Sequence, residues 1–323
     1  MKKTILLIFL GLISCENSLK QHRNSGAIFG TTYSVIYESK DDFQLEFENI
    51  FNAINRSMST YIPNSIISKV NTNRSTTIDA HFKTVLEGSK QIFEATEGRF
   101  DPTIGAVVNA WDFGPEGKIE QLDSLKIKDL MQSVGLDKVT LDGFQITKPI
   151  STKLDFNAIA KGYAVDKIAD FLSSKNASNF LVEIGGEIVC RGINSKKNTP
   201  WNIGIQNPNL ESEIPFLDTV VLNDEAMATS GTYRKFKIDE NGRRYTHIID
   251  TNTGYPSRTN ILSVSVIAEN CMTADAYATA LQTMPMNRIS KFLLAHTELK
   301  VFIVFENENK ELELKSFNGF QSN

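Results

Sequence analysis

Cysteine and histidine are scarce in this chain of 323 residues, which has three of the first and four of the second. The cysteines stand at positions 15, 190 and 271, too scattered for a disulfide framework or a cysteine-based zinc cluster. Lys and Arg (34) do not outnumber Asp and Glu (38), so the chain has no basic excess for general nucleic-acid binding. The composition is therefore that of an ordinary globular protein, and 41% hydrophobic residues are enough to form a substantial core.

The chain also lacks the short motifs that mark the commonest nucleotide-binding and hydrolytic sites. It has no G-x-x-x-x-G-K-[ST] loop and no G-x-G-x-x-G fingerprint, so neither a Walker-type site nor a Rossmann dinucleotide site is expected. H-E-x-x-H, C-x-x-C and G-x-S-x-G are absent as well. Any catalysis therefore uses a different set of residues.

The N-terminus has the features of a bacterial lipoprotein signal. Lys2 and Lys3 precede a short apolar run at 5–13, which is too short to span a bilayer and ends in Leu-Ile-Ser-Cys. This ending resembles a lipobox, where the signal is cleaved before a cysteine that becomes lipidated. We expect residues 1–14 to be the signal peptide, 15–26 the lipidated Cys15 with a polar tether, and 27–323 the functional domain. The alternative is a plain secretory signal in which Cys15 is incidental.

Apolar periodicity predicts a mixture of helices and strands in the domain. Helices are predicted at 41–58, 79–96, 158–173 and 273–283. Strands are predicted at 29–37, 180–184, 187–191, 201–205, 261–268 and 299–305. Because the two kinds do not alternate strictly, we expect a mixed α/β (α+β) sandwich, with a mixed or antiparallel sheet and flanking helices, rather than a doubly wound sheet.

Asp275 and Thr279 are the residues whose spacing suggests a metal site. They stand four apart in one predicted helix, so their side chains share a face. A carboxylate, a hydroxyl and a backbone carbonyl form an oxygen-only set that suits a hard cation such as Mg²⁺. The segment around Asp155 could supply the carbonyl, and Lys161 could meet a phosphate. The alternative is structural, with Asp275 as a first-turn carboxylate and Thr273 as the N-cap.

Seven segments in a fixed order resemble one known family. With x for variable positions, they are STYxP, FDPTxG, DxxxIAKGYAVD, LVEIGGE, ATSGxYR, YxHIIDxxTGxP and TADAxATAL. Their residues, order and spacing are similar to those of the ApbE family of FAD:protein FMN transferases, over roughly residues 27–306. The resemblance implies an enzyme that uses Mg²⁺ to cleave FAD at its pyrophosphate. FMN would pass to a Thr or Ser hydroxyl of a target flavoprotein through a phosphoester bond, and AMP would leave.

The resemblance also implies roles for individual residues. The implied Mg²⁺ ligands are the Asp275 carboxylate, the Thr279 hydroxyl and the Ala158 backbone carbonyl. The implied FAD contacts are Tyr61 near the flavin, Phe29, Phe100, Asp101, Pro102, Asp155, Lys161 and backbone near Ile249. Two positions depart from the family pattern: Phe29 stands where many members have Met, and residues 155–162 read DFNAIAKG instead of DLGGIAKG. The Asp, Ala and Lys positions of that second motif stay filled.

His247 is the candidate base for the acceptor hydroxyl, because its unperturbed pKa is about 6.5. It could instead hold a loop or touch the adenine, and Asp275 could act as the base while it also binds metal. Three other functions stay open: a Mg²⁺-dependent FAD pyrophosphatase that yields FMN and AMP, a non-catalytic FAD-binding lipoprotein, and a structural surface lipoprotein.

The resemblance finally implies a partner and a location. The acceptor would be a subunit of an Na⁺-translocating NADH:quinone oxidoreductase or a related complex. The enzyme would reach it as a lipoprotein anchored in the inner membrane and facing the periplasm, with no nucleic-acid partner. Outside the cytoplasm, Cys190 and Cys271 are expected to be buried thiols rather than redox centres.

Overall fold

A computed structural model describes residues 19–209, 211–233, 235–238 and 244–321. The predicted signal peptide and Cys15 lie outside these residues. Within the described ranges, no helix combines the length and the apolar character needed to cross a membrane.

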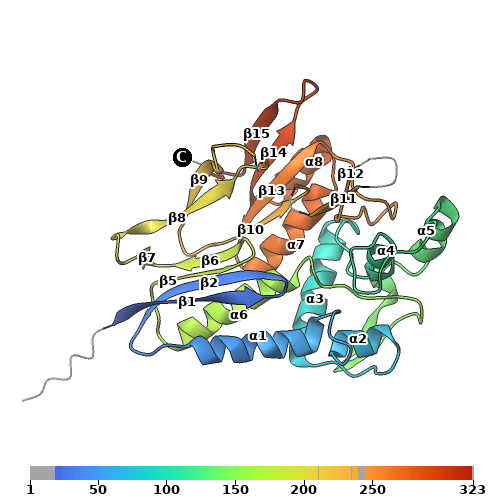
Figure 1. The fold of residues 1–323 in the computed structure, drawn as a ribbon, viewed down its shortest axis with the longest axis horizontal. Coiled ribbons are helices and arrows are strands. Elements are labelled where there is room, and N and C mark those ends of the chain that lie inside the picture. Colours follow the sequence, from blue (N-terminus) through green and yellow to red (C-terminus); the bar gives the residue numbers. More distant parts are fainter. Residues whose placement is uncertain (1–18, 210, 234, 239–243, 322–323) are drawn as a thin grey trace, which may run out of the picture.

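An eight-stranded antiparallel sheet forms the centre of the fold (Figure 1). Its spatial order is β1-β2-β5-β6-β10-β13-β14-β15, and all neighbouring strands run antiparallel. The strands are β1 (Lys20–Ile28), β2 (Thr31–Ser39), β5 (Phe180–Ile184), β6 (Glu187–Arg191), β10 (Ala226–Gly231), β13 (Ile261–Ala268), β14 (Lys300–Glu306) and β15 (Leu312–Phe317). β13 is buried at seven of its eight positions because both faces of the sheet are covered there.

Helices cover one face of this sheet (Figure 1). α6 (Ala160–Ser174) packs on β5 and β6, and α7 (Cys271–Gln282) packs on β10 and β13. Outside them lie α1 (Gln44–Met58), which packs on α6, and α3 (Ala80–Ala95), which packs on α7. The shorter helices are α2 (Ile66–Asn71), α4 (Gly105–Ala110), α5 (Ser124–Met131) and α8 (Met286–Ala295), with a 3₁₀ turn at Leu136–Lys138.

A second, smaller core lies on the opposite face of the sheet. A three-stranded sheet of β7 (Ile193–Asn194), β8 (Thr199–Gln206) and β9 (Phe216–Leu222) contributes Trp201 and Leu222 to it, and the main sheet contributes Met227 and Phe302. Two hairpins complete the described elements: β3 (Thr140–Asp142) with β4 (Gln145–Thr147), and β11 (Phe236–Ile238) with β12 (Arg244–Thr246). The predicted mixed α/β sandwich is confirmed. Cys190 and Cys271 are buried free thiols, as predicted.

The predicted tether is partly wrong, because residues 20–28 form strand β1. This strand pairs along its whole length with β2, from Lys20 opposite Ser39 to Ile28 opposite Thr31. His22 is consequently part of the fold, where it stacks on Tyr37 with ring centroids 5.2 Å apart. β1 is an edge strand with mostly exposed or half-buried side chains, so its sequence KQHRNSGAI lacks the apolar alternation that predicts a strand.

The assignment of Thr273 as the N-cap of its helix is also wrong. α7 begins at Cys271, and the side chain of Asn270 caps it by accepting a hydrogen bond of 2.8 Å from the Thr273 amide. Asp275 therefore lies in the second turn, away from the free amides at the helix end. The structural explanation of Asp275 as a first-turn carboxylate does not hold.

α6 and α7 approach each other closely at Gly162. A Cβ atom at this position would lie 2.3 Å from the Cys271 carbonyl oxygen and 2.8 Å from the Met272 Cα, which are both backbone atoms. Only a residue without a side chain allows this approach.

Gly162→Ala is therefore expected to destabilise the protein by more than the ~1–3 kcal/mol typical of overpacking, because two helix backbones must separate. Gly88→Ala in α3 is the matched control, since a Cβ there would meet the flexible end of the Met272 side chain at 2.7 Å. Thermal melts should show a large loss for Gly162→Ala and a small change for Gly88→Ala. Equal losses would contradict the close approach.

Candidate active site

Asp275 joins the N-terminal part of α6 to α7. Its carboxylate is 3% exposed, and one oxygen (Oδ2) accepts a hydrogen bond of 3.0 Å from the Gly162 amide in the first turn of α6. Burial raises the pKa of Asp275, and the nearby Lys161 ammonium opposes that rise. The Gly162 bond uses only one of the two carboxylate oxygens, so Oδ1 is available to a ligand.

Lys161 lies between two buried carboxylates. Its ammonium forms an ion pair of 2.6 Å with Glu187, whose side chain is 3% exposed, and it interacts with the charge of Asp275. Although burial acts in the opposite direction, the two carboxylates raise the pKa of Lys161 above its usual range. One positive and two negative charges leave this cluster with a net negative charge, which favours the binding of a further cation.

Thr279 lies one turn beyond Asp275 on α7, as predicted. Its hydroxyl is 3.0 Å from the hydroxyl of Ser230, at the end of β10. When Thr279 donates its proton to Ser230, an oxygen lone pair stays free for a metal. Ala158 lies in the turn that leads into α6, four residues before Gly162, and its carbonyl is outside the helical hydrogen-bond ladder.

These donors are all oxygen atoms. Among the residues that the structure describes, no group of three or more His, Cys, Asp and Glu side chains is placed to hold a metal ion. A site built from one carboxylate, one hydroxyl and one carbonyl fits Mg²⁺, which keeps several of its water ligands, better than a transition metal.

His247 adds a base whose orientation is fixed. Its Nδ1 lies 2.9 Å from the backbone carbonyl oxygen of Lys235. Since a carbonyl only accepts, Nδ1 carries the proton, and the lone pair of the neutral ring is on Nε2. Burial, assisted by the positive charges of Lys235 and Lys161, lowers the pKa of His247 to about 4. The ring is therefore neutral at physiological pH.

Three more polar side chains lie near His247 and Lys161: those of Asp155, Tyr61 and Lys235. Burial raises the pKa of Asp155, and hydrogen bonds from Asn157 and, to a smaller extent, the charge of Lys235 oppose this. Tyr61 is 58% exposed and donates a hydrogen bond of 3.3 Å to the Phe113 carbonyl. Partial loss of solvent around its hydroxyl and the charge of Asp155 raise its pKa. Tyr61, Asp155, Lys235, His247 and Lys161 are thus near enough for the charge of each to affect the next one.

The other predicted FAD contacts lie deeper in the fold. Phe100 is 3% exposed and belongs to the main core. The buried Asp101 carboxylate accepts hydrogen bonds from the amide and hydroxyl of Thr103 and from the Leu136 amide. Pro102 contributes its carbonyl to the Asp155 amide at 2.7 Å. These three residues therefore position Asp155 and the surrounding loops.

Phe29 and Ile249 are also packed against neighbouring residues. Phe29 adopts a left-handed backbone conformation (φ 50°) between β1 and β2, and its ring lies 5.8 Å from that of Phe51. Ile249 is buried against Val107 and Val134. A contact with FAD at either position is still a prediction.

An ion pair and two hydrogen bonds join the loops around this region. Arg99 pairs with Asp250 at 3.2 Å, and Thr251 donates a hydrogen bond of 2.6 Å to the Gly98 carbonyl. The Trp111 indole donates to the Gly254 carbonyl at 2.8 Å. Residues on both sides of FDPTxG are thereby joined to YxHIIDxxTGxP, and Arg99 and Asp250 are 151 positions apart.

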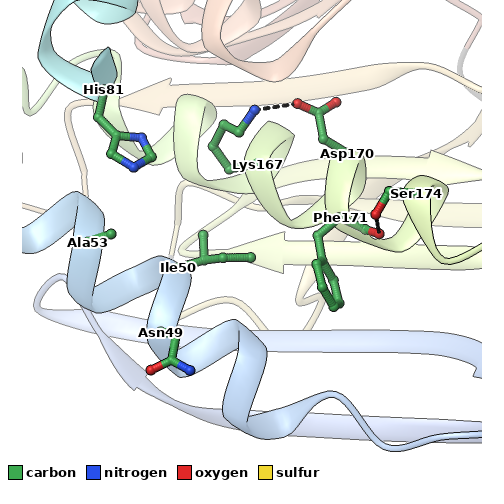
Figure 2. Close-up of a pocket in the computed structure, with 8 residues that line it drawn as sticks. All are labelled: Asn49, Ile50, Ala53, His81, Lys167, Asp170, Phe171 and Ser174. Atoms are coloured by element: carbon green, nitrogen blue, oxygen red, sulfur yellow. Dashed lines mark hydrogen bonds and ion pairs between the residues drawn. The ribbon is translucent and has the colours of Figure 1, made fainter. Parts of the chain in front are cut away.

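A hollow of about 490 Å³ between α1 and α6 lies elsewhere (Figure 2). Figure 2 shows its lining of Asn49, Ile50, Ala53, His81, Lys167, Asp170, Phe171 and Ser174. No predicted site residue is among them, and its charged pair, Lys167 and Asp170, is already joined at 2.7 Å. The chemistry-bearing residues gather instead where α6 and α7 begin.

Comparisons with known proteins identify the family of this chain. The ApbE family model matches residues 29–303. The chain belongs to the ApbE family. It is 34% identical to the FAD:protein FMN transferase of Vibrio cholerae over 98% of both chains, and 36% identical to that of Haemophilus influenzae over 90% of both. The solved structure of the flavin transferase ApbE from Vibrio cholerae matches with a TM-score of 0.84 at 31% identity, covering 94% of this chain and 99% of that one.

Four further residues that contact the candidate site were not predicted from the sequence. Glu187 and Ser230 lie inside recognised motifs but carry no predicted role, and Lys235 lies just beyond one. The fourth is Asp166, which accepts hydrogen bonds of 2.8 Å from the Cys271 and Met272 amides and so caps α7 from α6. The acidic ends of LVEIGGE and KGYAVD could have indicated Glu187 and Asp166, because a charge next to apolar residues usually has a buried partner.

Proposed function

We propose that this protein transfers FMN from FAD to a Thr or Ser hydroxyl of a target flavoprotein with the help of Mg²⁺. The observation that carries the proposal is the cluster of Asp275, Lys161 and Thr279 near a neutral, oriented His247. The names of the family relatives support the same activity. A protein that only stored FAD would have no use for this costly set of buried charges.

The donor set identified above fits a Mg²⁺ ion held by Asp275 Oδ1, the Thr279 hydroxyl and the Ala158 carbonyl. When bound, the ion supplies positive charge that polarises the pyrophosphate and stabilises the leaving phosphate. Lys161 adds a second positive charge on the same side. Phosphoryl transfer depends mainly on such charge stabilisation and on in-line positioning of the reacting groups.

His247 then acts on the acceptor. The Nε2 lone pair takes the proton of the acceptor hydroxyl as its oxygen attacks the phosphorus of the FMN half. One P–O bond forms to the acceptor, the bond to the bridging oxygen breaks, and the bridging oxygen leaves with AMP. The acceptor is thereby linked to FMN by a phosphoester.

We further propose where this reaction takes place. The lipobox-like ending at Cys15 supports a lipid anchor, and we place the protein on the periplasmic face of the inner membrane. The acceptor is then a membrane-bound flavoprotein, such as a subunit of an NADH:quinone oxidoreductase complex.

Mass spectrometry of a co-expressed candidate acceptor tests the activity. The expected result is a mass increase equal to FMN on one Thr or Ser, with one AMP released per FMN transferred. Purified protein with FAD and Mg²⁺ but no acceptor should release AMP much more slowly. AMP release at the same rate with and without acceptor would identify a FAD pyrophosphatase instead.

The pH dependence of transfer tests the role of His247. Because its pKa is about 4 rather than 6.5, transfer should stay nearly constant from pH 7.5 down to pH 5.5. A base with an ordinary His pKa would lose about tenfold over the same range, since it would be mostly protonated one unit below its pKa. Initial rates with FAD and an acceptor peptide would show the difference.

The stability of the protein gives an independent check on the same pKa. Below pH 6.5 the unfolded chain binds a proton at this histidine while the folded protein does not, so stability falls as the pH drops from about 6.5 to 4. His247→Gln should remove this part of the pH dependence and most of the activity. A rate that falls with an apparent pKa near 6.5, or an unchanged stability profile in His247→Gln, would contradict the assignment.

A further inference from the structure

The short distance between the anchor position and the first strand limits how this protein sits on a membrane. β1 begins at Lys20, five residues after Cys15. Whatever their conformation, five residues span at most ~18 Å. Once Cys15 carries lipid, the end of the sheet at which β1 starts must stay that close to the membrane surface.

That end of the sheet is rich in exposed lysines. Lys20 pairs with Ser39 next to Lys40, and the Gln21 side chain donates a hydrogen bond of 3.4 Å to Ser195, next to Lys196 and Lys197. Lys175 follows the end of α6 on the way into β5, which begins opposite Tyr37 at this end of β2. Figure 1 shows the starts of β1 and β7 at the same end of the molecule, at the left of the view. We call Lys20, Lys40, Lys175, Lys196 and Lys197 the lysine end.

Acidic residues at this end offset part of this charge but not all of it. Asp41 and Asp42 lie next to Lys40, but Asp42 accepts hydrogen bonds from Asn24, Tyr37 and the Gln44 amide. Glu38 lies opposite Gln21, and Asp224 accepts a hydrogen bond from the Gly192 amide beside β7, while Arg191 lies opposite Phe180 at the same end. The five lysines and Arg191, six positive charges against these four carboxylates, leave this end positive by two, in a chain whose formal net charge is −4.

We propose that the lysine end faces the anionic lipid headgroups of the leaflet that holds the anchor. The inference rests on the proposed lipidation of Cys15. The short connection holds the lysines within reach of the surface, where their attraction to anionic lipids acts over about a Debye length, ~8 Å. The two features together hold the domain in one orientation.

The orientation sets the height of the active site. β1 and β2 run from the lysine end to the turn at Phe29 and Gly30, a distance of ~27 Å for eight strand intervals. This turn lies beside the Gly185–Gly186 turn, where a Cβ on Gly185 would be 2.8 Å from Thr31, and Glu187 follows directly. The part of the active site at Glu187 therefore lies at most ~45 Å above the membrane, the sum of strand and connection lengths. The acceptor hydroxyl must be presented within that height.

Fluorescence quenching by headgroup-labelled lipids tests the orientation. The full lipidated protein is reconstituted into vesicles of phosphatidylglycerol and phosphatidylethanolamine with a nitroxide headgroup lipid, after labelling at Thr199→Cys or Asn309→Cys. Both positions are exposed, and Cys190 and Cys271 are too buried to react. Thr199 is close to the lysine end, and Asn309 is at the far β14–β15 turn. We expect several-fold stronger quenching at position 199.

Charge reversal tests the role of the lysines. Lys196→Glu with Lys197→Glu should lower the ratio of quenching at the two positions, and so should replacing the anionic lipid with a neutral one. Lys310→Glu with Lys315→Glu, on the β14–β15 hairpin, is the matched control and should leave the ratio unchanged. FMN transfer to a soluble acceptor peptide should be normal in both variants, because none of these lysines belongs to the active site.

The outcomes separate the orientation from the anchor. Equal quenching at positions 199 and 309 in protein whose Cys15 peptide carries lipid would overturn the orientation and leave the anchor intact. A Cys15 peptide without lipid would overturn both. Normal FMN transfer in either case would leave the proposed activity standing.

Discussion

Asp275→Asn is expected to abolish FMN transfer while the protein stays folded. The carboxylate has two tasks: Oδ2 accepts from the Gly162 amide, and Oδ1 is free for the metal. The Asn side chain keeps one oxygen, which the Gly162 amide holds, and turns its NH₂ group toward the metal position. A hydrogen-bond donor there cannot bind Mg²⁺, so we expect a loss of at least a hundredfold, of the order seen when a transition-state charge contact is removed.

Asp275→Ala does not distinguish the role of the carboxylate in metal binding from its hydrogen bond with the Gly162 amide. It removes the metal ligand and also leaves the buried Gly162 amide without its partner, which costs ~1–3 kcal/mol of stability. Thr279→Val should have a milder effect on transfer than Asp275→Asn, because water can replace a neutral hydroxyl in a Mg²⁺ shell.

The measurement is FMN transfer across a Mg²⁺ titration, with thermal melts of each variant. Asp275→Asn should melt near the wild-type temperature and stay inactive at every Mg²⁺ concentration. Full activity of this variant at low Mg²⁺ would rule out the metal site. If activity and the melt were lost together in Asp275→Asn, the role of Asp275 would be structural.

Much of the fold could be predicted from local sequence patterns. The strands 180–184, 187–191 and 261–268 have the predicted bounds, because dense apolar runs between turn residues define buried strands. The helix predicted at 79–96 is observed at Ala80–Ala95, with Asp79 as its N-cap. β1 could not be predicted in this way, because an edge strand of polar residues owes its structure to pairing with β2.

In the candidate site, too, local spacing could be predicted from the sequence, whereas contacts between distant segments could not. Asp275 and Thr279 could be paired from their spacing alone, since residues one turn apart share a helix face. The partner of Lys161 could not be predicted, because Glu187 lies 26 positions along the chain in another element and only the packing of α6 on the sheet brings them together. The low pKa of His247 likewise depends on its burial in the fold and, to a smaller extent, on the charges of Lys235 and Lys161, which its own motif does not contain.

Lys161→Met is expected to cause the largest loss of stability among these site variants. It leaves Glu187 and Asp275, each about 3% exposed, without the ammonium that lies between them. Breaking a buried ion pair by removing one partner costs ~3–5 kcal/mol. The stranded carboxylates should then bind protons more readily, so part of the lost stability should return as the pH falls toward 5.

A second substitution distinguishes this electrostatic effect from a simple packing defect. Lys161→Met combined with Glu187→Gln removes one positive and one negative charge together, and most of the lost stability should return at pH 7. FMN transfer should stay lost in the double variant, because no ammonium is left to face the pyrophosphate. Urea unfolding at pH 5 and pH 7, together with transfer assays, measures both effects. A double variant as unstable as Lys161→Met would show that the alkyl chain of Lys161, rather than its charge, holds the start of α6 in place.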